Sequence, residues 1–158
     1  MNSTETDLRA ARVLGPREGR EVPGGVLETV VKVESAETGG AFALVEYALD
    51  PNAWAGPEPH VHNSGSETFY VLEGSMEFVL GEERITATAG TCVHIPAGAV
   101  HTFSNPGPGR VRFSQILCPG SLLSMIEDIV ELLQAGVTDQ EQLAAVFRRH
   151  DSEVVGKS

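Results

Sequence analysis

The pattern of hydrophobic and polar positions changes twice along the chain, near residue 26 and again near residue 118. Between these points, short apolar runs alternate with polar residues and are separated by turns that contain Gly or Pro. Many short strands at near-regular spacing are typical of an all-β sandwich or barrel. The predicted strands cover residues 27–34, 41–49, 67–73, 75–80, 84–88, 91–95, 100–104 and 110–117. We therefore expect one mainly β domain over residues 26–118.

Beyond residue 118 the period changes from two to about 3.6, which is the period of an α-helix. The apolar stripe of the first predicted helix consists of Leu122, Ile126, Ile129, Val130 and Leu133. This helix is expected to end at Gly136. Thr138 and Glu141 have the spacing of a capping box and begin a second helix, which ends near Arg149. Residues 119–158 are thus predicted to form two helices and a tail, with the helices packed on the β domain.

The first 25 residues differ from the rest because they are rich in Gly, Pro, Arg and Glu, which predicts a flexible arm. A short helical turn is expected around residues 8–14. The start of the chain lacks the basic and apolar regions of a signal peptide, and the sequence has no run of about 18 apolar residues. Cys92 and Cys118 are too few for a disulfide framework, and we expect both to be buried thiols. These features predict a cytoplasmic protein without membrane contact.

The charge of the chain bears on its partners. Acidic residues outnumber basic ones by 22 to 11, and the formal net charge is −11. Such a balance repels the phosphates of nucleic acids and favours solubility. Two helices joined by a short turn also occur in DNA-binding proteins, but residues 121–158 carry seven acidic residues against three Lys or Arg. We therefore expect no nucleic-acid partner.

Two stretches contain the residues best suited to chemistry. His60 and His62 lie two apart on a predicted strand, so their side chains face the same way. Glu67 would face the opposite side of an unbroken strand, but the turn sequence 63–66 allows the chain to turn it toward the same cavity. His101 begins a later strand that follows a Pro- and Gly-containing turn. Three imidazoles and one carboxylate would suit a divalent Fe, Mn, Ni, Co, Cu or Zn ion.

Both stretches resemble the signature motifs of the cupin superfamily. The first motif is His-x-His, four residues, Glu, six residues and Gly, represented by His60, His62, Glu67 and Gly74. The second is Gly, five residues, Pro-x-Gly, two residues, His, three residues and Asn, represented by Gly90, Pro96, Gly98, His101 and Asn105. The resemblance covers about residues 40–118 and departs from the family at Trp54, where cupins often have Gly. It implies a single double-stranded β-helix (jelly-roll) barrel with a C-terminal two-helix appendage.

The same resemblance implies a function. One divalent transition metal would be bound by His60, His62, Glu67 and His101, with Glu67 also acting as the catalytic base. The enzyme would act on a small, mostly apolar molecule that bears oxygen, as a quercetinase-like dioxygenase or other oxidoreductase. The alternatives are a non-oxidative polyketide cyclase or isomerase, in which the metal is a Lewis acid, and a non-catalytic cupin that binds a small molecule. The expected lining of the barrel consists of Phe69, Met76, Phe78, Phe103 and Phe113.

Some expectations concern oligomerisation and residues outside the motifs. Cupins commonly form homodimers, so the resemblance implies a homodimer. The predicted strand 27–34 is the candidate for pairing with a second copy. His94 is predicted to lie on a wall or an interface, and His150 to be exposed to solvent. Gln115 either lines the barrel or belongs to the core. The two remaining aromatic candidates, Tyr47 and Trp54, would occupy the rim or the core.

Overall fold

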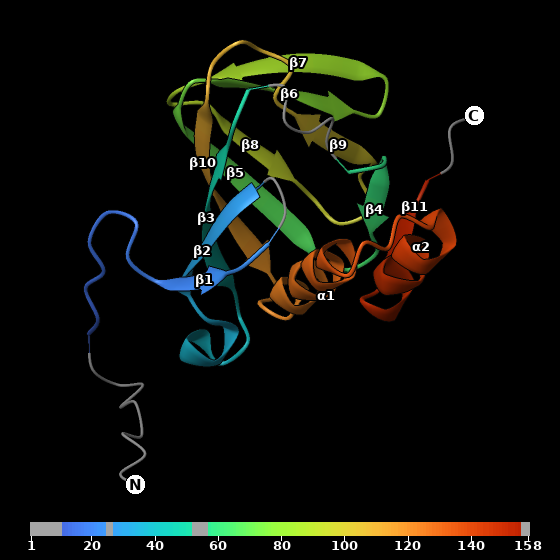
Figure 1. Cartoon of the computed structure of the whole chain (residues 1–158), viewed down its shortest axis with the longest axis horizontal. Helices are drawn as coiled ribbons and strands as arrows, with labels where there is room; N and C mark the ends of the chain where they lie inside the picture. Colours follow the sequence, from blue (N-terminus) through green and yellow to red (C-terminus); the bar gives the residue numbers. More distant parts are fainter. Residues whose placement is uncertain (1–10, 25–26, 52–56, 156–158) are drawn as a thin grey trace, which may run out of the picture.

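Two antiparallel sheets dominate the computed structural model, which describes residues 11–24, 27–51 and 57–155 (Figure 1). The six-stranded sheet consists, in order, of β1 (Arg20–Val22), β2 (Leu27–Val33), β3 (Ala43–Leu49), β10 (Val111–Cys118), β5 (Ser66–Glu73) and β8 (Cys92–Ile95). The five-stranded sheet consists of β11 (Ser152–Val154), β4 (His60–His62), β9 (His101–Ser104), β6 (Ser75–Leu80) and β7 (Glu83–Thr88). A 3₁₀ turn (Ser35–Thr38) joins β2 to β3. The predicted mainly β architecture is confirmed.

The core lies between the two sheets because alternate side chains of each strand point inward. In β10, for example, the alternate residues Val111, Phe113, Gln115 and Leu117 are buried, while the residues that alternate with them are partly or largely exposed. The side chains predicted to line the barrel, Phe69, Met76, Phe78, Phe103 and Phe113, are all buried in one cluster. The ring of Phe69 lies 5.1 Å from those of both Phe78 and Phe103. These side chains therefore form a packed core beside the barrel wall.

All eight predicted strands are present, with ends within two residues of the predicted ones. Strand β1 falls inside the segment predicted to be a flexible arm, where it pairs with β2 through Arg20 and Val31. The predicted turn at residues 8–14 lies partly outside the described residues, and residues 11–14 are not helical. Strand β2 was expected to offer a free edge for dimerisation, and this expectation is wrong. Strand β2 lies between β1 and β3, so it has no free edge to offer a second copy of the chain. The homodimer itself stays a prediction.

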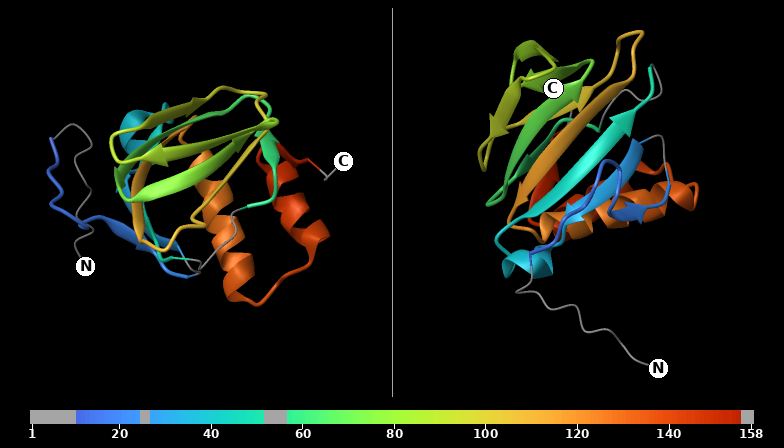
Figure 2. Two further views of the ribbon diagram at one scale, coloured as in Figure 1. Left: turned by 90° about the horizontal axis from the view of Figure 1, so that it is seen from above. Right: turned by 90° about the vertical axis from the view of Figure 1, so that its left-hand side faces the viewer.

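Two helices follow the barrel, α1 (Leu122–Gln134) and α2 (Gln140–Arg149), and they lie side by side on one side of it (Figure 2). Neither of these described helices combines the length and the apolar character needed to cross a membrane. The cap of α2 is Asp139, not Thr138, because the Asp139 carboxylate accepts a hydrogen bond from the Gln142 amide at 3.0 Å.

The buried face of α1 also differs from the predicted stripe. Leu133 is 43% exposed, whereas Leu123 and Met125 are buried. The reason is that α1 has two neighbours: Leu122 and Leu123 join the barrel core, and Met125 packs in a second cluster with Phe147 of α2. One apolar stripe on α1 cannot face both the barrel and α2.

Strand β11 was not predicted and completes the sheet beside β4 (Figure 1). Its register pairs Ser152 with His62 and Val154 with His60. Three residues are too few to show a strand period, so the pairing depends on contacts that the local sequence does not reveal. The C-terminal segment thereby becomes part of the wall that carries two of the candidate histidines.

Candidate metal centre

The four candidate ligands come together between the two sheets. His60 and His62 lie on β4, His101 on the neighbouring β9, and Glu67 on β5 of the opposite sheet. All four are buried, and one potential ligand atom from each lies within 4.8 Å of the others. The chain between His62 and Glu67 leaves β4 and turns before β5, which removes the parity conflict noted in the sequence.

Local backbone geometry orients two of the imidazoles. The Nδ1 atom of His60 lies 2.8 Å from the carbonyl oxygen of Glu58. The Nδ1 atom of His101 lies 3.0 Å from the carbonyl oxygen of Ala99. Because a carbonyl oxygen only accepts hydrogen bonds, Nδ1 carries the hydrogen in both rings. The lone pair of a neutral ring is then on Nε2, the nitrogen that is left for a metal.

The third imidazole is oriented by a side chain. Ser152 Oγ donates its hydrogen to the carbonyl oxygen of His150 at 3.0 Å and lies 2.7 Å from His62 Nδ1. A hydroxyl has one hydrogen, so the serine accepts from His62, whose lone pair is then on Nε2. Within the described residues this buried Nε2 atom has no hydrogen-bond partner, although Glu67 Oε1 lies 3.3 Å away. A buried acceptor without a partner is costly, and a bound cation would satisfy it.

Glu67 faces the imidazoles with both carboxylate oxygens held. Gln115 Nε2 donates to Oε1 at 2.8 Å, and His101 Nε2 lies 2.8 Å from Oε2. Burial alone would raise the pKa of Glu67, but the hydrogen bond with His101 and the nearby charges of His101 and His62 lower it further than burial raises it. Burial, aided by the nearby His101, lowers the pKa of His60 to about 4. At neutral pH the site therefore offers a carboxylate and a neutral His60, both forms that bind metal ions.

The electrostatics of the pair His101 and Glu67 also fit a cation. His101 donates through Nδ1, so a neutral ring would point a lone pair at the carboxylate 2.8 Å away. Two facing lone pairs at this distance need a proton or a metal ion between them. Three nitrogen donors and one oxygen donor form the set that divalent transition metals accept. The residues therefore fit a metal of this class.

Two residues that the sequence motifs do not contain, Gln115 and Phe147, lie beside the candidate ligands. Gln115, whose place was left open, is buried and holds Glu67. Phe147 of α2 was predicted only as part of a helix, but its ring lies 5.1 Å from that of His60. Only the strand parity of Gln115 pointed to the interior, whereas no pattern in the sequence linked Phe147 or Ser152 to the histidines.

The remaining candidates lie elsewhere. His94 is exposed on β8, where its Nδ1 lies 2.8 Å from Thr68 Oγ1. His150 was expected to be exposed, but its side chain is only 20% exposed because its Nε2 lies 2.7 Å from Asp128 Oδ2. Tyr47 is buried and stacks on Phe113, while Trp54 lies outside the described residues.

The prediction that both cysteines are buried is wrong. Cys92 is exposed and Cys118 is partly exposed, so neither is the fully buried thiol that the sequence suggested. Both sit at positions of their strands whose side chains alternate with the buried ones. The parity of the strand therefore outweighs the usual preference of a free cysteine for the interior.

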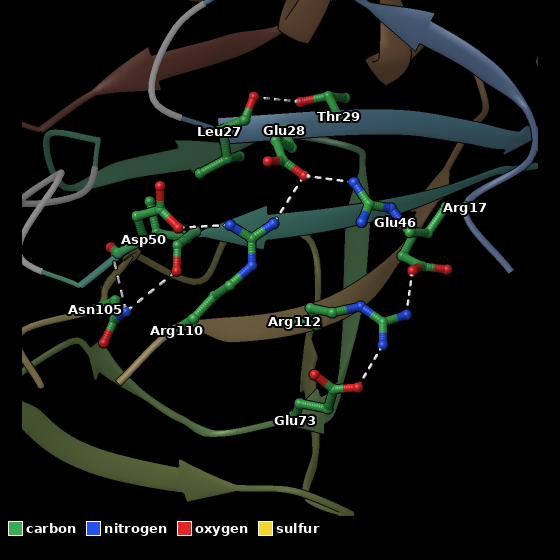
Figure 3. A network of polar contacts seen from close by, with 11 residues as sticks. Arg17, Leu27, Glu28, Thr29, Glu46, Asp50, Glu73, Asn105, Arg110 and Arg112 are labelled. Atoms are coloured by element: carbon green, nitrogen blue, oxygen red, sulfur yellow. Dashed lines mark hydrogen bonds and ion pairs between the residues drawn. The ribbon is translucent and has the colours of Figure 1, made fainter. Parts of the chain in front are cut away.

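A second polar network lies on the outer side of the six-stranded sheet (Figure 3). Arg112 contacts Glu46 and Glu73, each at 2.5 Å. Arg110 contacts Asp50 at 2.5 Å and Glu28 at 2.8 Å. Each guanidinium is thus matched by two carboxylates, and these groups are exposed or half-buried. The arrangement is that of a surface ion-pair network.

Comparison with known proteins places the barrel in a family. A family model described as a cupin domain matches residues 45–118. The polyketide cyclase RemF from Streptomyces resistomycificus is 24% identical, with a TM-score of 0.52 over 68% of this chain and 85% of its own. A protein with a double-stranded β-helix domain from Klebsiella pneumoniae is 23% identical, with a TM-score of 0.52 over 68% and 84%.

A sugar phosphate isomerase of the cupin superfamily from Silicibacter pomeroyi is 22% identical, with a TM-score of 0.51 over 59% of each chain. No curated protein sequence matches this chain. At these identities the structural likeness concerns the fold. Together with the family match, it supports a cupin domain over residues 45–118 of this chain.

Proposed function

We propose that this protein is a metal-dependent enzyme whose ion is bound by His60, His62, Glu67 and His101. The observation that carries the proposal is the direction of the nitrogen lone pairs. All three Nδ1 atoms are engaged in hydrogen bonds outside the centre, and His62 Nε2 is buried with no hydrogen-bond partner in the described part of the chain. This arrangement leaves the Nε2 atoms and the Glu67 carboxylate for one divalent Fe, Mn, Ni, Co, Cu or Zn ion.

An ion of this class supplies Lewis-acid chemistry or, where two oxidation states are accessible, redox chemistry. The side chains of the protein supply the rest. The buried histidines would hold and orient the ion at a position shielded from solvent. Glu67 can accept a proton from a substrate hydroxyl, since Gln115 holds one of its oxygens in a defined position. Glu67 is therefore the proposed catalytic base.

For the reaction itself we propose a quercetinase-like dioxygenation of a small, mostly apolar substrate with an ionisable oxygen. The aromatic core next to the ligands supports an apolar substrate, and the resemblance of the two motifs supports the reaction class. A second candidate is a non-oxidative cyclisation or isomerisation. The likeness of fold to the polyketide cyclase RemF favours this candidate, which requires the same four ligands.

The first experiment determines metal content by elemental analysis of the wild type, of His62→Ala and of the matched control His94→Ala. The wild type and the control should contain about one equivalent of a transition metal. His62→Ala should have lost most of it, since loss of the hydrogen-bond partner of a histidine ligand alone lowers metal affinity about 10–100-fold. His94 is a suitable control because it is an exposed histidine away from the site. Equal metal content in all three proteins would overturn the ligand assignment.

The second experiment measures oxygen uptake by the metal-loaded protein with flavonols, diketones and phenols. Oxygen consumption coupled to substrate loss supports the dioxygenase. Product formation without oxygen consumption overturns the dioxygenase and supports the cyclase or isomerase. If metal removal leaves substrate affinity intact and no substrate is turned over, the protein is a binding cupin and both enzymatic proposals fail.

A further inference from the structure

The C-terminal segment 147–155 flanks β4, the strand that carries His60 and His62. On one side of β4 lies β9 with His101, and on the other lies β11. The segment is attached at both ends of β4, because the Val155 amide donates to Pro59 at 2.7 Å and the Asn63 amide donates to Asp151 at 2.9 Å. The side chains of Asn63 and Ser64 also donate to the Asp151 carboxylate. This segment lies outside the family match at residues 45–118.

The three histidines are anchored in two different ways. His60 and His101 each use a carbonyl oxygen two residues earlier in the chain, so their anchors come with the local backbone. His62 instead uses Ser152, which is 90 positions away. The orientation of two ligands is thus local, whereas that of the third depends on the docking of the C-terminal strand.

The single hydrogen of the Ser152 hydroxyl determines its role. Its hydroxyl is buried and donates to the His150 carbonyl, which leaves a lone pair to accept from His62 Nδ1. Without the hydroxyl, a hydrogen on Nδ1 would be buried with no hydrogen-bond partner, which disfavours that tautomer. The other tautomer would instead carry its hydrogen on Nε2, and Glu67 Oε1 lies 3.3 Å from that atom and accepts hydrogen bonds. Glu67 therefore favours the tautomer that cannot bind a metal, and Ser152 opposes it.

We propose that Ser152 is a positioning residue of the metal centre, which holds His62 in its Nδ1–H tautomer and so keeps Nε2 available as a ligand. The link to metal binding rests on the proposed function. The tautomer, however, is a property of the metal-free protein and can be measured without any ion.

The test compares the full-length wild type with Ser152→Ala, Ser152→Thr and the matched control Ser64→Ala. Ser64 contacts the same C-terminal segment through Asp151 but touches no candidate ligand. Nitrogen-15 NMR of the metal-free proteins reports which ring nitrogen of His62 carries the hydrogen. We expect the Nδ1–H form in the wild type, in Ser152→Thr and in the control. In Ser152→Ala we expect the Nε2–H form to become populated.

Metal titration provides the second readout. Ser152→Ala should bind Zn²⁺ or Co²⁺ about 10–100-fold more weakly than the wild type, as is usual when the partner of a histidine ligand is lost. Ser152→Thr should restore the affinity, and Ser64→Ala should leave it unchanged.

The outcomes separate this inference from the proposed function. An Nε2–H tautomer of His62 in the metal-free wild type overturns the inference even if Ser152→Ala does not fold. An unchanged tautomer and unchanged Zn²⁺ affinity in Ser152→Ala overturn it as well. If the wild type shows the Nδ1–H tautomer and Ser152→Ala loses it, but neither protein binds metal, the positioning role stands and the proposed function fails.

Discussion

The two faces of the six-stranded sheet both carry linked polar side chains, but they differ in whether those groups are satisfied. On β10, Gln115 points inward to Glu67, and Arg112, three residues earlier, points outward to Glu46 and Glu73 (Figure 3). On the outer face, each guanidinium has two carboxylate partners. On the inner face, His62 Nε2 is buried without a hydrogen-bond partner among the described residues.

This difference separates a structural network from a functional one. Water and salt screen the outer charges, so each exposed pair contributes about 1 kcal/mol or less to folding. The inner groups are buried, where an unmatched lone pair is expensive and a cation is bound strongly. The incomplete network is therefore where we propose the metal site, and the complete one supports the sheet.

The largest predicted effect is the stabilisation of the inner face by metal. At a free metal concentration about 100 times the Kd, binding adds about 2.7 kcal/mol to the free energy of unfolding. For a chain of this size, that raises the melting temperature by roughly 5–10 °C. His101→Ala should show no such rise, whereas Arg112→Ala should show all of it. Calorimetry with and without metal measures both, and an equal rise in His101→Ala would contradict the inner-face assignment.

An intermediate effect is predicted for Gln115→Leu, which removes the hydrogen bond to Glu67 Oε1. The carboxylate then loses a defined orientation, and metal affinity should fall about tenfold or more. Ser114→Ala is the matched control, because Ser114 is the neighbouring residue on β10 and has the opposite parity. Metal titration compares the two variants, and similar affinities would mean that Gln115 does not support the site.

The smallest effect is predicted for the outer face. Arg112→Ala should lower the free energy of unfolding by about 1 kcal/mol, because its ion pairs with Glu46 and Glu73 are partly exposed. The loss should shrink in 1 M salt, where the screening length is about 3 Å. Urea unfolding at low and high salt measures it. A fall in metal affinity as large as that of Gln115→Leu would show that the two faces are coupled.

Much of the site could be predicted because its determinants are local. The spacing of His60 and His62 places both on one side of a strand, and the turn sequence before Glu67 allows the change of direction. The parity of β10 pointed Gln115 inward. The same alternation places Cys92 on the outer face of β8, because Val93 and Ile95 are buried.

Other features depended on contacts between distant segments. His150 is partly buried because α1 brings Asp128 to it. Strand β2 is not an edge because a three-residue strand from the N-terminal region covers it. Neither partner is visible in a local pattern, since short pairings have no period to detect.

The sequence by itself determined the eight predicted strands of the barrel and the inward faces of most of them, because these follow from the alternation of side chains. Only the tertiary structure decided which strand lies beside β4 and therefore which group holds His62. Sheet pairing joins segments by backbone hydrogen bonds that nearly every residue can form, so the sequence near Ser152 carries no mark of its partner 90 positions away.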